Sequence, residues 1–168
     1  AGADIEYIGP TSVTPLFTAV EFGNKDTVEF LLKRGADVNF ADINGENVLM
    51  CAIQCGHTDI VQLLLADERI KINQVDNNGW NALLVALECK KPAIAKLLID
   101  HGADINCVTQ DDKKTSPLLV ALECGLTDIA TLLIDKGADI NHADSKGHTP
   151  LLLASRHYKS IKKLLRAK

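Results

Sequence analysis

A repeat of about 33 residues is the feature that most constrains how this chain can fold. A block of the type Gly-Ala-Asp-Ile or Gly-Ala-Asp-Val, followed by Asn or Glu, occurs four times, and Lys71-Ile72-Asn73 stands in the one remaining position. The last residues of the five blocks are separated by 33, 34, 33 and 35 positions. A second series in the same register consists of Thr14-Pro15-Leu16, Asn47-Val48-Leu49, Asn81-Ala82-Leu83, Ser116-Pro117-Leu118 and Thr149-Pro150-Leu151. Five units therefore fill the chain.

Each unit carries the local signals of two short helices and a turn-rich finger. The first residue of every triplet has a side-chain acceptor suited to a helix N-cap, and in three units proline follows at a position where its missing N–H costs nothing. Glycine recurs eight residues past the proline position, as Gly23, Gly56 and Gly125, and predicts the end of the first helix. A second helix should follow and stop at another glycine, such as Gly35. The polar segment after it, for example 76–79, predicts a projecting hairpin-like finger.

The repeat length and the two signatures closely resemble the ankyrin repeat, and the resemblance covers essentially every residue. It implies an all-α ankyrin-repeat solenoid of stacked helix-turn-helix units with projecting β-hairpin-like fingers, because one helix pair cannot bury its own apolar face. We expect one domain over residues 1–168, with repeats at approximately 1–34, 35–69, 70–101, 102–136 and 137–168. The chain starts with a finger strand and not with a polar capping helix, so we expect a fragment of a longer protein.

The sequence departs from the family pattern at several positions. The position after Thr-Pro-Leu, where the family usually has His, should pack apolar side chains; its residues are Phe17, Met50, Leu84, Leu119 and Leu152. The fourth finger carries two extra residues around 111–114, and the second helix of the second repeat should run on through 67–69. We expect irregular structure at both places.

Composition indicates a folded chain with unevenly placed charge. The apolar fraction of 46% and charged fraction of 24% exclude disorder, and no apolar run approaches the roughly 18 residues of a membrane span. The five cysteines are an odd number without paired short spacings, which suits free thiols in a reducing compartment, so we expect an intracellular protein, cytoplasmic or nuclear. The net charge is −4, yet every charged residue after Asp144 is basic. The acidic body should therefore repel nucleic acid.

Signatures of catalysis or metal binding are missing from the sequence. There is no Gly-rich phosphate loop, no nucleophile elbow, no His-Glu-x-x-His and no calcium loop. The best metal candidate is Cys51 and Cys55 with His57 beyond them, but structural zinc needs four ligands and no second pair lies nearby in sequence. We expect no enzyme activity, no cofactor and no metal.

The resemblance implies that ligands lie across the fingers and the exposed side of the first helices, which line a concave face. The partner-binding positions carried over in this way are Glu21, Phe22, Gln54, Cys55, Trp80, Glu88, Cys89, Lys113, Lys114, Glu123, Cys124, Arg156 and His157. Further finger positions are Ile43, Asn44, Glu46, Asn77, Asn78, Asp112, Ser145, Lys146 and His148. One residue per repeat forms a ladder with acids beside it, and this ladder consists of Phe22, Cys55, Cys89, Cys124 and His157.

An apolar groove with an acidic edge suits a protein or peptide that carries apolar anchors and Lys or Arg. We therefore expect a non-catalytic, monomeric protein-protein interaction module without membrane contact. The competing interpretation of the cysteines is that small thiols fill gaps between helices. Trp80 is either an anchor for a partner or a ring folded over the adjacent finger or helix. The basic tail around Ile161 is interpreted as the polar outer face of a C-terminal cap.

A function of another class stays open, in which the domain senses an oligonucleotide or nucleotide. Trp80 would stack a base, and the finger lysines Lys113, Lys114 and Lys146 would hold phosphates. A salt titration separates the two, because phosphate binding weakens steeply with salt.

Asparagines at the start of the fingers are candidate modification sites. Repeats similar to these are substrates of an asparaginyl hydroxylase that recognises Leu eight residues before the target, an acid two before it and Val or Ile just before it. Asn39, Asn106 and Asn141 match this pattern fully, whereas Asn73 has Lys71 in place of the acid and should react less. The competing interpretation is that these asparagines only shape the finger.

Overall fold

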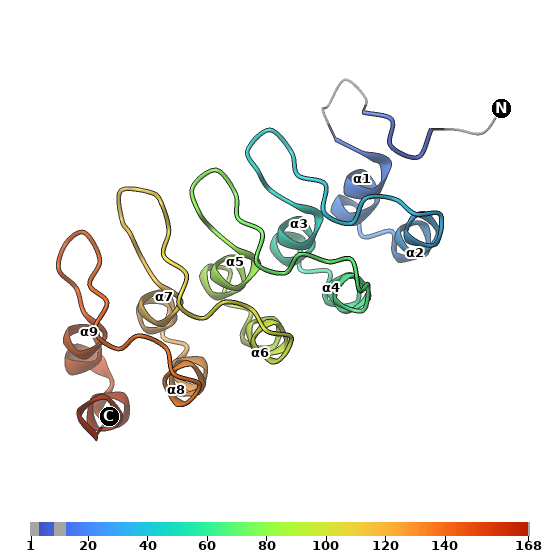
Figure 1. Cartoon of the computed structure of the whole chain (residues 1–168). Helices are drawn as coiled ribbons and strands as arrows, with labels where there is room; N and C mark the ends of the chain where they lie inside the picture. The colour runs from blue at the N-terminus through green and yellow to red at the C-terminus, as the bar shows by residue number, and fades with distance from the viewer. Residues whose placement is uncertain (1–3, 9–12, 168) are drawn as a thin grey trace.

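A computed structural model describes residues 4–8 and 13–167 and places five repeats in a row, each with two helices, joined by projecting fingers (Figure 1). The helices form two rows. The inner row lies beside the fingers and consists of α1 (Pro15–Glu21), α3 (Val48–Cys55), α5 (Ala82–Glu88), α7 (Pro117–Glu123) and α9 (Pro150–His157). The outer row consists of α2 (Lys25–Lys33), α4 (Thr58–Leu65), α6 (Pro92–Asp100), α8 (Thr127–Asp135) and α10 (Lys159–Ala167). The predicted all-α solenoid is confirmed.

The inner helices begin where the sequence predicts them. The side chains of Thr14, Asn47, Asn81 and Thr149 each accept a hydrogen bond from the backbone N–H three residues later. These bonds satisfy N–H groups that have no partner inside the helix. The fifth cap differs, because the buried hydroxyl of Ser116 has no hydrogen-bond partner in the described part of the chain, so α7 starts on Pro117 without a side-chain cap.

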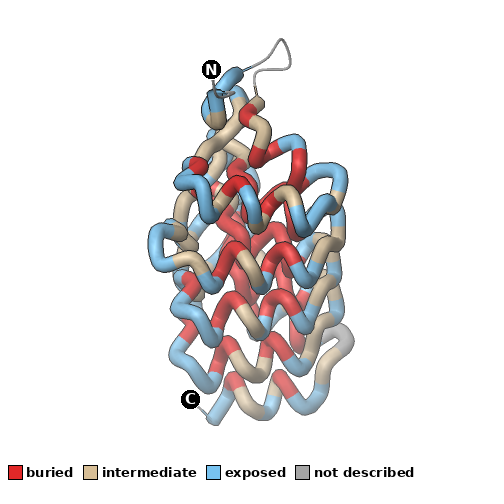
Figure 2. The backbone as a smooth tube through the Cα atoms, turned by 90° about the vertical axis from the view of Figure 1, so that its right-hand side faces the viewer, coloured by how far each residue is buried: buried red, intermediate tan, exposed pale blue. Residues whose placement is uncertain are grey.

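The core is continuous from repeat to repeat, and Figure 2 shows the buried positions recurring along the whole stack. Each inner helix contacts the next one along the row. Leucines of the repeated triplet are buried in the first four repeats, and Leu118 is only 1% exposed. The apolar residues that replace the family histidine are buried there as well, as expected. In the last repeat Leu151 and Leu152 are exposed.

Neighbouring fingers are joined through their backbones. The N–H of Asn77 donates to the carbonyl of Asn44 (3.0 Å), that of Gln110 to Asn78 (2.7 Å) and that of Ser145 to Lys113 (2.9 Å). At Gly79, whose φ is +79°, an added Cβ would lie 2.7 Å from the Gln110 nitrogen, so a side chain there would push the two fingers apart. Fingers two to five therefore form one connected row.

Two irregular places were predicted, and one prediction was wrong in detail. In the fourth finger the backbone pairing starts at Thr109 and Thr115, wider than the pairing between Asp42 and Glu46 in the second, so the two extra residues enlarge the turn. The second helix of the second repeat, however, does not run on through 67–69, because α4 ends at Leu65. Residues 66–69 form a turn.

That turn is held by Arg69. Its guanidinium pairs with the Asp67 carboxylate (2.6 Å) and also donates to the carbonyl oxygens of Ala36 (3.1 Å) and Leu32 (3.4 Å) at the end of α2. The carbonyls at a helix end lack partners inside the helix, and a cation is favourable beside them. The turn thus caps the outer helix of the preceding repeat.

The last helix has one apolar side and one basic side. Ile161 and Leu165 of α10 are buried, whereas Lys159, Lys163 and Arg166 are exposed on its other side. None of the helices in the described part of the chain has the length and apolar character needed to cross a membrane.

Candidate functional site

Two adjoining cavities lie between the fingers and the inner row, in the first three repeats. The first has a volume of about 400 Å³ and is lined by Val13, Phe17, Glu21, Asp42, Glu46, Cys51, Gln54 and Cys55. The second also has about 400 Å³ and is lined by Gln54, Asp76, Asn78, Trp80, Val85, Glu88 and Cys89. Gln54 lines both, so the cavities are neighbours. We use the name groove for the surface formed by these two cavities and by Lys113 and Glu123 of the fourth repeat.

The first cavity combines an apolar floor with carboxylates. Phe17 is buried beneath it, and Glu21, the last residue of α1, is exposed at its edge. The Asp42 carboxylate is used by the finger itself, because it accepts the backbone N–H groups of Asn44 and Glu46 (both 2.9 Å). The carboxylates of Glu21 and Glu46 make no ion pair or hydrogen bond within the described residues.

Glu46 is the most crowded of these acids. Burial raises the pKa of its carboxyl group, and the nearby carboxylates of Asp42 and Asp76 raise it further. Glu21 adds to the same effect. Several negative charges that lie close together favour any cation that enters the site.

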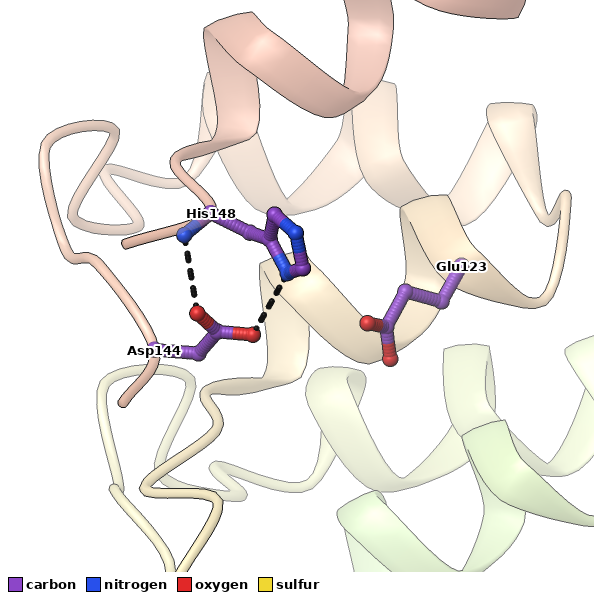
Figure 3. A group of neighbouring side chains, drawn as sticks. All are labelled: Glu123, Asp144 and His148. Carbon is purple, nitrogen blue, oxygen red and sulfur yellow. Dashed lines mark hydrogen bonds and ion pairs between the residues drawn. The ribbon is translucent and has the colours of Figure 1, made fainter. Parts of the chain in front are cut away.

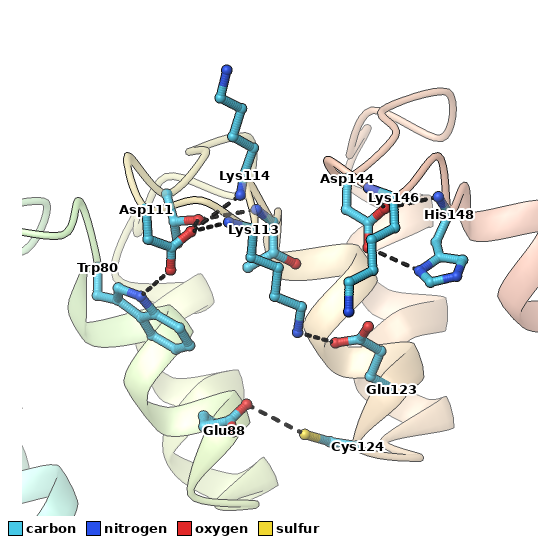
Figure 4. A network of polar contacts seen from close by, with 12 residues as sticks. Trp80, Glu88, Asp111, Lys113, Lys114, Glu123, Cys124, Asp144, Lys146 and His148 are labelled. Carbon is cyan, nitrogen blue, oxygen red and sulfur yellow. Dashed lines mark hydrogen bonds and ion pairs between the residues drawn. The ribbon is translucent and has the colours of Figure 1, made fainter.

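Trp80 forms a wall of the second cavity and is half-buried. Its backbone N–H donates to Asp76 (2.8 Å), and its indole Nε1 donates to the Asp111 carboxylate of the next finger (3.2 Å; Figure 4). Although burial disfavours the charged form of Asp111, hydrogen bonds from Thr109 and Trp80 hold its pKa below the usual value. The ring is therefore fixed against the neighbouring finger while one side still lines the cavity. The ring thus lies against the adjacent finger, as one of the two interpretations expects, and the role of Trp80 as an anchor stays a prediction.

The predicted ladder is not uniform in burial. Phe22 is 78% exposed and Cys55 is exposed, whereas Cys89 and Cys124 are half-buried. All five cysteines are free thiols, as expected from their number. Burial raises the pKa of Cys89 and Cys124, and it raises that of Cys107 to about 12. The side chains of Arg156 and His157 lie outside the described residues.

The fourth repeat carries a lysine inside the groove. Lys113 of the widened finger extends down to α7, where its Nζ lies 2.6 Å from Glu123 Oε2 (Figure 4). The hydrogen bond to Glu123 raises the pKa of Lys113, with further contributions from Glu88 and Asp144. Lys114 of the same turn points away from the groove.

Glu123, Asp144 and His148 form the one group of potential metal ligands found in the described part of the chain (Figure 3). Their ligand atoms lie within 4.8 Å of one another. The protein already uses both carboxylates: Lys113 pairs with Glu123, and Asp144 accepts from His148 Nδ1 (2.9 Å) and from the backbone N–H of that residue (2.8 Å). Each of the three side chains therefore already has a partner within the protein.

Other predicted positions are separate from the groove cavities. His57, from the metal candidate with Cys51 and Cys55, hydrogen-bonds instead to the Glu21 carbonyl (3.2 Å). Asn39 and Asn106 lie at the base of the fingers, where their side chains accept backbone N–H groups of the following repeat (2.7 and 2.8 Å). The side chain of Asn141 makes no such bond within the described residues.

Sequence reasoning missed the acids Asp42 and Asp76 as parts of the groove wall. Both stand five residues before a helix-capping residue, as Asp144 does. This spacing could have identified these residues from the sequence, because an Asp whose carboxylate accepts several backbone N–H groups lies against its own turn. The apolar floor was also missed, since Val85 and Phe17 read as core residues.

Comparison with known proteins agrees with the geometry. The family model for ankyrin repeats, described as three copies, matches residues 16–109 and 106–168. Relatives include an Arf-GAP with coiled-coil, ANK repeat and PH domain-containing protein 2 of Gallus gallus, which is 41% identical over 38% of this chain and 8% of that protein. A probable E3 ubiquitin-protein ligase XBOS33 of Oryza sativa subsp. japonica is 44% identical over 31% of this chain and 10% of its own length. Rabankyrin-5 of Homo sapiens is 40% identical over 36% of this chain and 5% of its own length. The chain thus spans a tenth or less of these curated relatives.

Proposed function

Because this chain belongs to the ankyrin-repeat family, whose repeats are generally protein-protein interaction modules and typically non-catalytic, we propose that it binds a partner protein through the groove. The segment that it recognises carries basic side chains beside apolar ones. The observation that carries the proposal is the pairing of an apolar floor with acids that lack ion-pair partners within the described residues. Glu21, Glu46 and Glu88 are these acids.

A lysine or arginine side chain matches such a cavity. Its methylene stem covers apolar surface while its charged head stays near carboxylates. In the second cavity the stem would lie on Trp80 and Val85, and the head would reach Glu88. An aromatic ring next to a cation adds attraction, and such rings are common anchors at interfaces. A neighbouring apolar side chain of the partner would cover the exposed Phe22 or the thiols of the ladder.

The oligonucleotide alternative has less support. Lys113 is engaged by Glu123. Trp80 donates to Asp76 through its backbone N–H and to Asp111 through its indole, and the charges of these two carboxylates repel phosphate. The surface around the proposed stacking residue is therefore acidic.

Peptide binding tests the proposal directly. The probe is a short fluorescein-labelled peptide of Ala and Ser that carries Leu and Arg, followed by fluorescence anisotropy; its partner probe has Glu in place of Arg. We expect binding of the Arg peptide alone, weakened about tenfold by Glu88→Lys. The matched control is Asp135→Lys, which makes the same charge change at an exposed position of α8 in the outer row.

Two results would contradict the proposal. One is equal loss of affinity in Glu88→Lys and Asp135→Lys, which would show that only the net charge matters. The other is binding of a single-stranded oligonucleotide with a steep salt dependence while the Arg peptide fails to bind, which would favour phosphate recognition.

A further inference from the structure

Three inner helices end on glutamate, at the same side of the groove. Glu21 is the last residue of α1, Glu88 of α5 and Glu123 of α7. The C-terminus of a helix carries partial negative charge, so an acid there is unfavourable unless a cation accompanies it. Helix stability does not explain three glutamates at this position, whereas attraction of cations does.

One of the three glutamates already has its cation. Lys113 Nζ lies 2.6 Å from Glu123 Oε2, and both side chains are partly shielded from solvent, with 43% and 30% exposed. Figure 4 shows the lysine extending from the finger to the end of α7. It reaches α7 because the fourth finger has the wider turn, and its backbone is fixed there by Asp111 and by the Ser145 N–H. The lysine is therefore positioned by its finger.

The other two glutamates make no ion pair within the described residues. The carboxylate of Glu88 accepts from the Cys124 thiol at 3.9 Å, and its charge contributes to the raised pKa of Lys113, with which it forms no ion pair. Each of the two lines a cavity, of about 400 Å³ in both cases. At this helix position the glutamate has no ion pair in the first and third repeats and has one in the fourth.

We propose that Lys113 fills, from within the chain, the third of three equivalent cation positions in the groove, so that basic side chains of a bound partner enter only those at Glu21 and Glu88. This inference rests on the proposed function. It implies that the part of the groove open to the partner's cations ends at the fourth finger. It also determines the spacing between these cations. Lys113 shows, in the chain's own structure, the contact that a partner's lysine makes at Glu88.

The spacing follows from the helix rows. Packed helices lie about 8–10 Å apart, and α3 stands between α1 and α5, so the two open positions are about 16–20 Å apart. A peptide in the extended polyproline II conformation rises about 3.1 Å per residue with three residues per turn. Arginines six residues apart therefore reach both positions from one side of such a peptide, and a third arginine three residues further would reach Glu123.

The test uses two labelled peptides and three variants. One peptide carries two arginines six residues apart, which reach Glu21 and Glu88. The other adds a third arginine three residues further, which reaches Glu123. Lys113→Met frees Glu123, and Lys114→Met removes the same charge from the neighbouring residue that points away from the groove. The double variant Lys113→Met with Glu123→Gln removes both the lysine and the position it fills.

We expect the wild type to bind both peptides equally within about twofold. Lys113→Met should bind the three-arginine peptide about fivefold more tightly than the two-arginine peptide, as expected for a partly exposed ion pair, whereas Lys114→Met should show no such preference. The double variant should lose the preference. Equal behaviour of Lys113→Met and Lys114→Met, or a clear preference of the wild type for three arginines, would overturn the inference.

A second measurement separates this inference from the proposed function. In ¹⁵N NMR spectra at neutral pH, the ammonium signal of Lys113 should be protected from exchange with water and should lose that protection in Glu123→Gln. If no peptide binds and the protection is seen, the proposed function fails while the position of Lys113 stands. If Lys113 is unprotected in the wild type, the inference is wrong whatever the peptides do.

Discussion

The indole N–H of Trp80, on the third finger, donates a hydrogen bond to the carboxylate of Asp111, on the fourth. The bond connects two fingers through side chains, next to the backbone bond from Gln110 to Asn78. It also fixes the orientation of the ring that lines the second cavity. A fixed ring loses little conformational freedom when a partner binds, which favours binding.

Two substitutions separate the packing of Trp80 from its hydrogen bond. Trp80→Phe keeps an aromatic ring and should lower the free energy of unfolding by about 1 kcal/mol, because only the bond to Asp111 is lost. Trp80→Ala should cost about 2–3 kcal/mol, since packing is lost as well. Urea unfolding followed by circular dichroism gives both values. Trp80→Ala should also weaken binding of the Arg peptide by about 2 kcal/mol; unchanged binding would mean that the ring has only a structural role.

Stacking of the repeats depends on the leucines of the repeated triplet. Leu118 is 1% exposed between neighbouring inner helices, so Leu118→Ala should cost about 2–5 kcal/mol of unfolding free energy. Ser145→Ala, at an exposed finger tip, should stay within about 0.5 kcal/mol of the wild type. Thermal unfolding of both variants checks this, and equal shifts in Tm would contradict the assigned register.

Arg69 joins the first and second repeats. Its guanidinium donates to Ala36 and Leu32 at the end of α2, so Arg69→Met should lower the free energy of unfolding by about 1 kcal/mol. The control is Lys33→Met, which removes an equally charged side chain from an exposed pair with Glu29 and should cost about 0.3 kcal/mol. Chemical unfolding distinguishes the two. A smaller effect for Arg69 than for Lys33 would exclude a joining role.

The asparagines at the start of the fingers should differ in reactivity with an asparaginyl hydroxylase. The side chains of Asn39, Asn73 and Asn106 each accept a backbone N–H of the next repeat, so this contact does not distinguish them. Asn39 and Asn106 have an acid two residues earlier, whereas Asn73 has Lys71 there. We expect Asn39 and Asn106 to gain oxygen before Asn73. Incubation with an asparaginyl hydroxylase and timed peptide mass spectrometry test the order, and faster addition of oxygen at Asn73 than at Asn39 would refute it.

Glu46 should make stability depend on pH. Its folded-state pKa is raised above the usual value of 4.5, so the folded protein holds the proton more tightly than the unfolded chain does. The contribution of Glu46 to the free energy of unfolding therefore falls as pH rises through that raised pKa. Glu46→Gln should stabilise the protein by a few tenths of a kcal/mol at pH 7 and not at pH 4. Tm values of both proteins at the two pH values test this; a gain at pH 4 alone would reverse the sign.

The sequence was sufficient for the repeats, the inner helices and most of their caps, because those features depend on residues close together in the chain. The caps at Asn47 and Asn81, for example, involve only the backbone N–H three residues later. The positions of Glu21 and Glu88 in the groove also followed from the repeat, since equivalent positions in a solenoid share one environment.

The sequence could not predict contacts that depend on how far a finger extends. The pairing of Lys113 with Glu123 requires the widened turn, and the bond from Trp80 to Asp111 requires the side-by-side placement of two fingers. The turn at 66–69 differs from the predicted helix because the pairing of Asp67 with Arg69 and the bonds of Arg69 to the preceding repeat favour the turn.

The row of joined fingers has a mechanical consequence. Under tension between the ends of the chain, the helix rows resist separation through apolar packing, which yields gradually, whereas the bonds from Asn77 to Asn44, Gln110 to Asn78 and Ser145 to Lys113 are short-ranged and break abruptly. Each repeat should therefore detach in a separate step, with a force peak at the moment its finger is released. The solenoid would behave as a spring. The hydrogen bonds between fingers would determine its stiffness, and the packing of the helix rows would determine its extension.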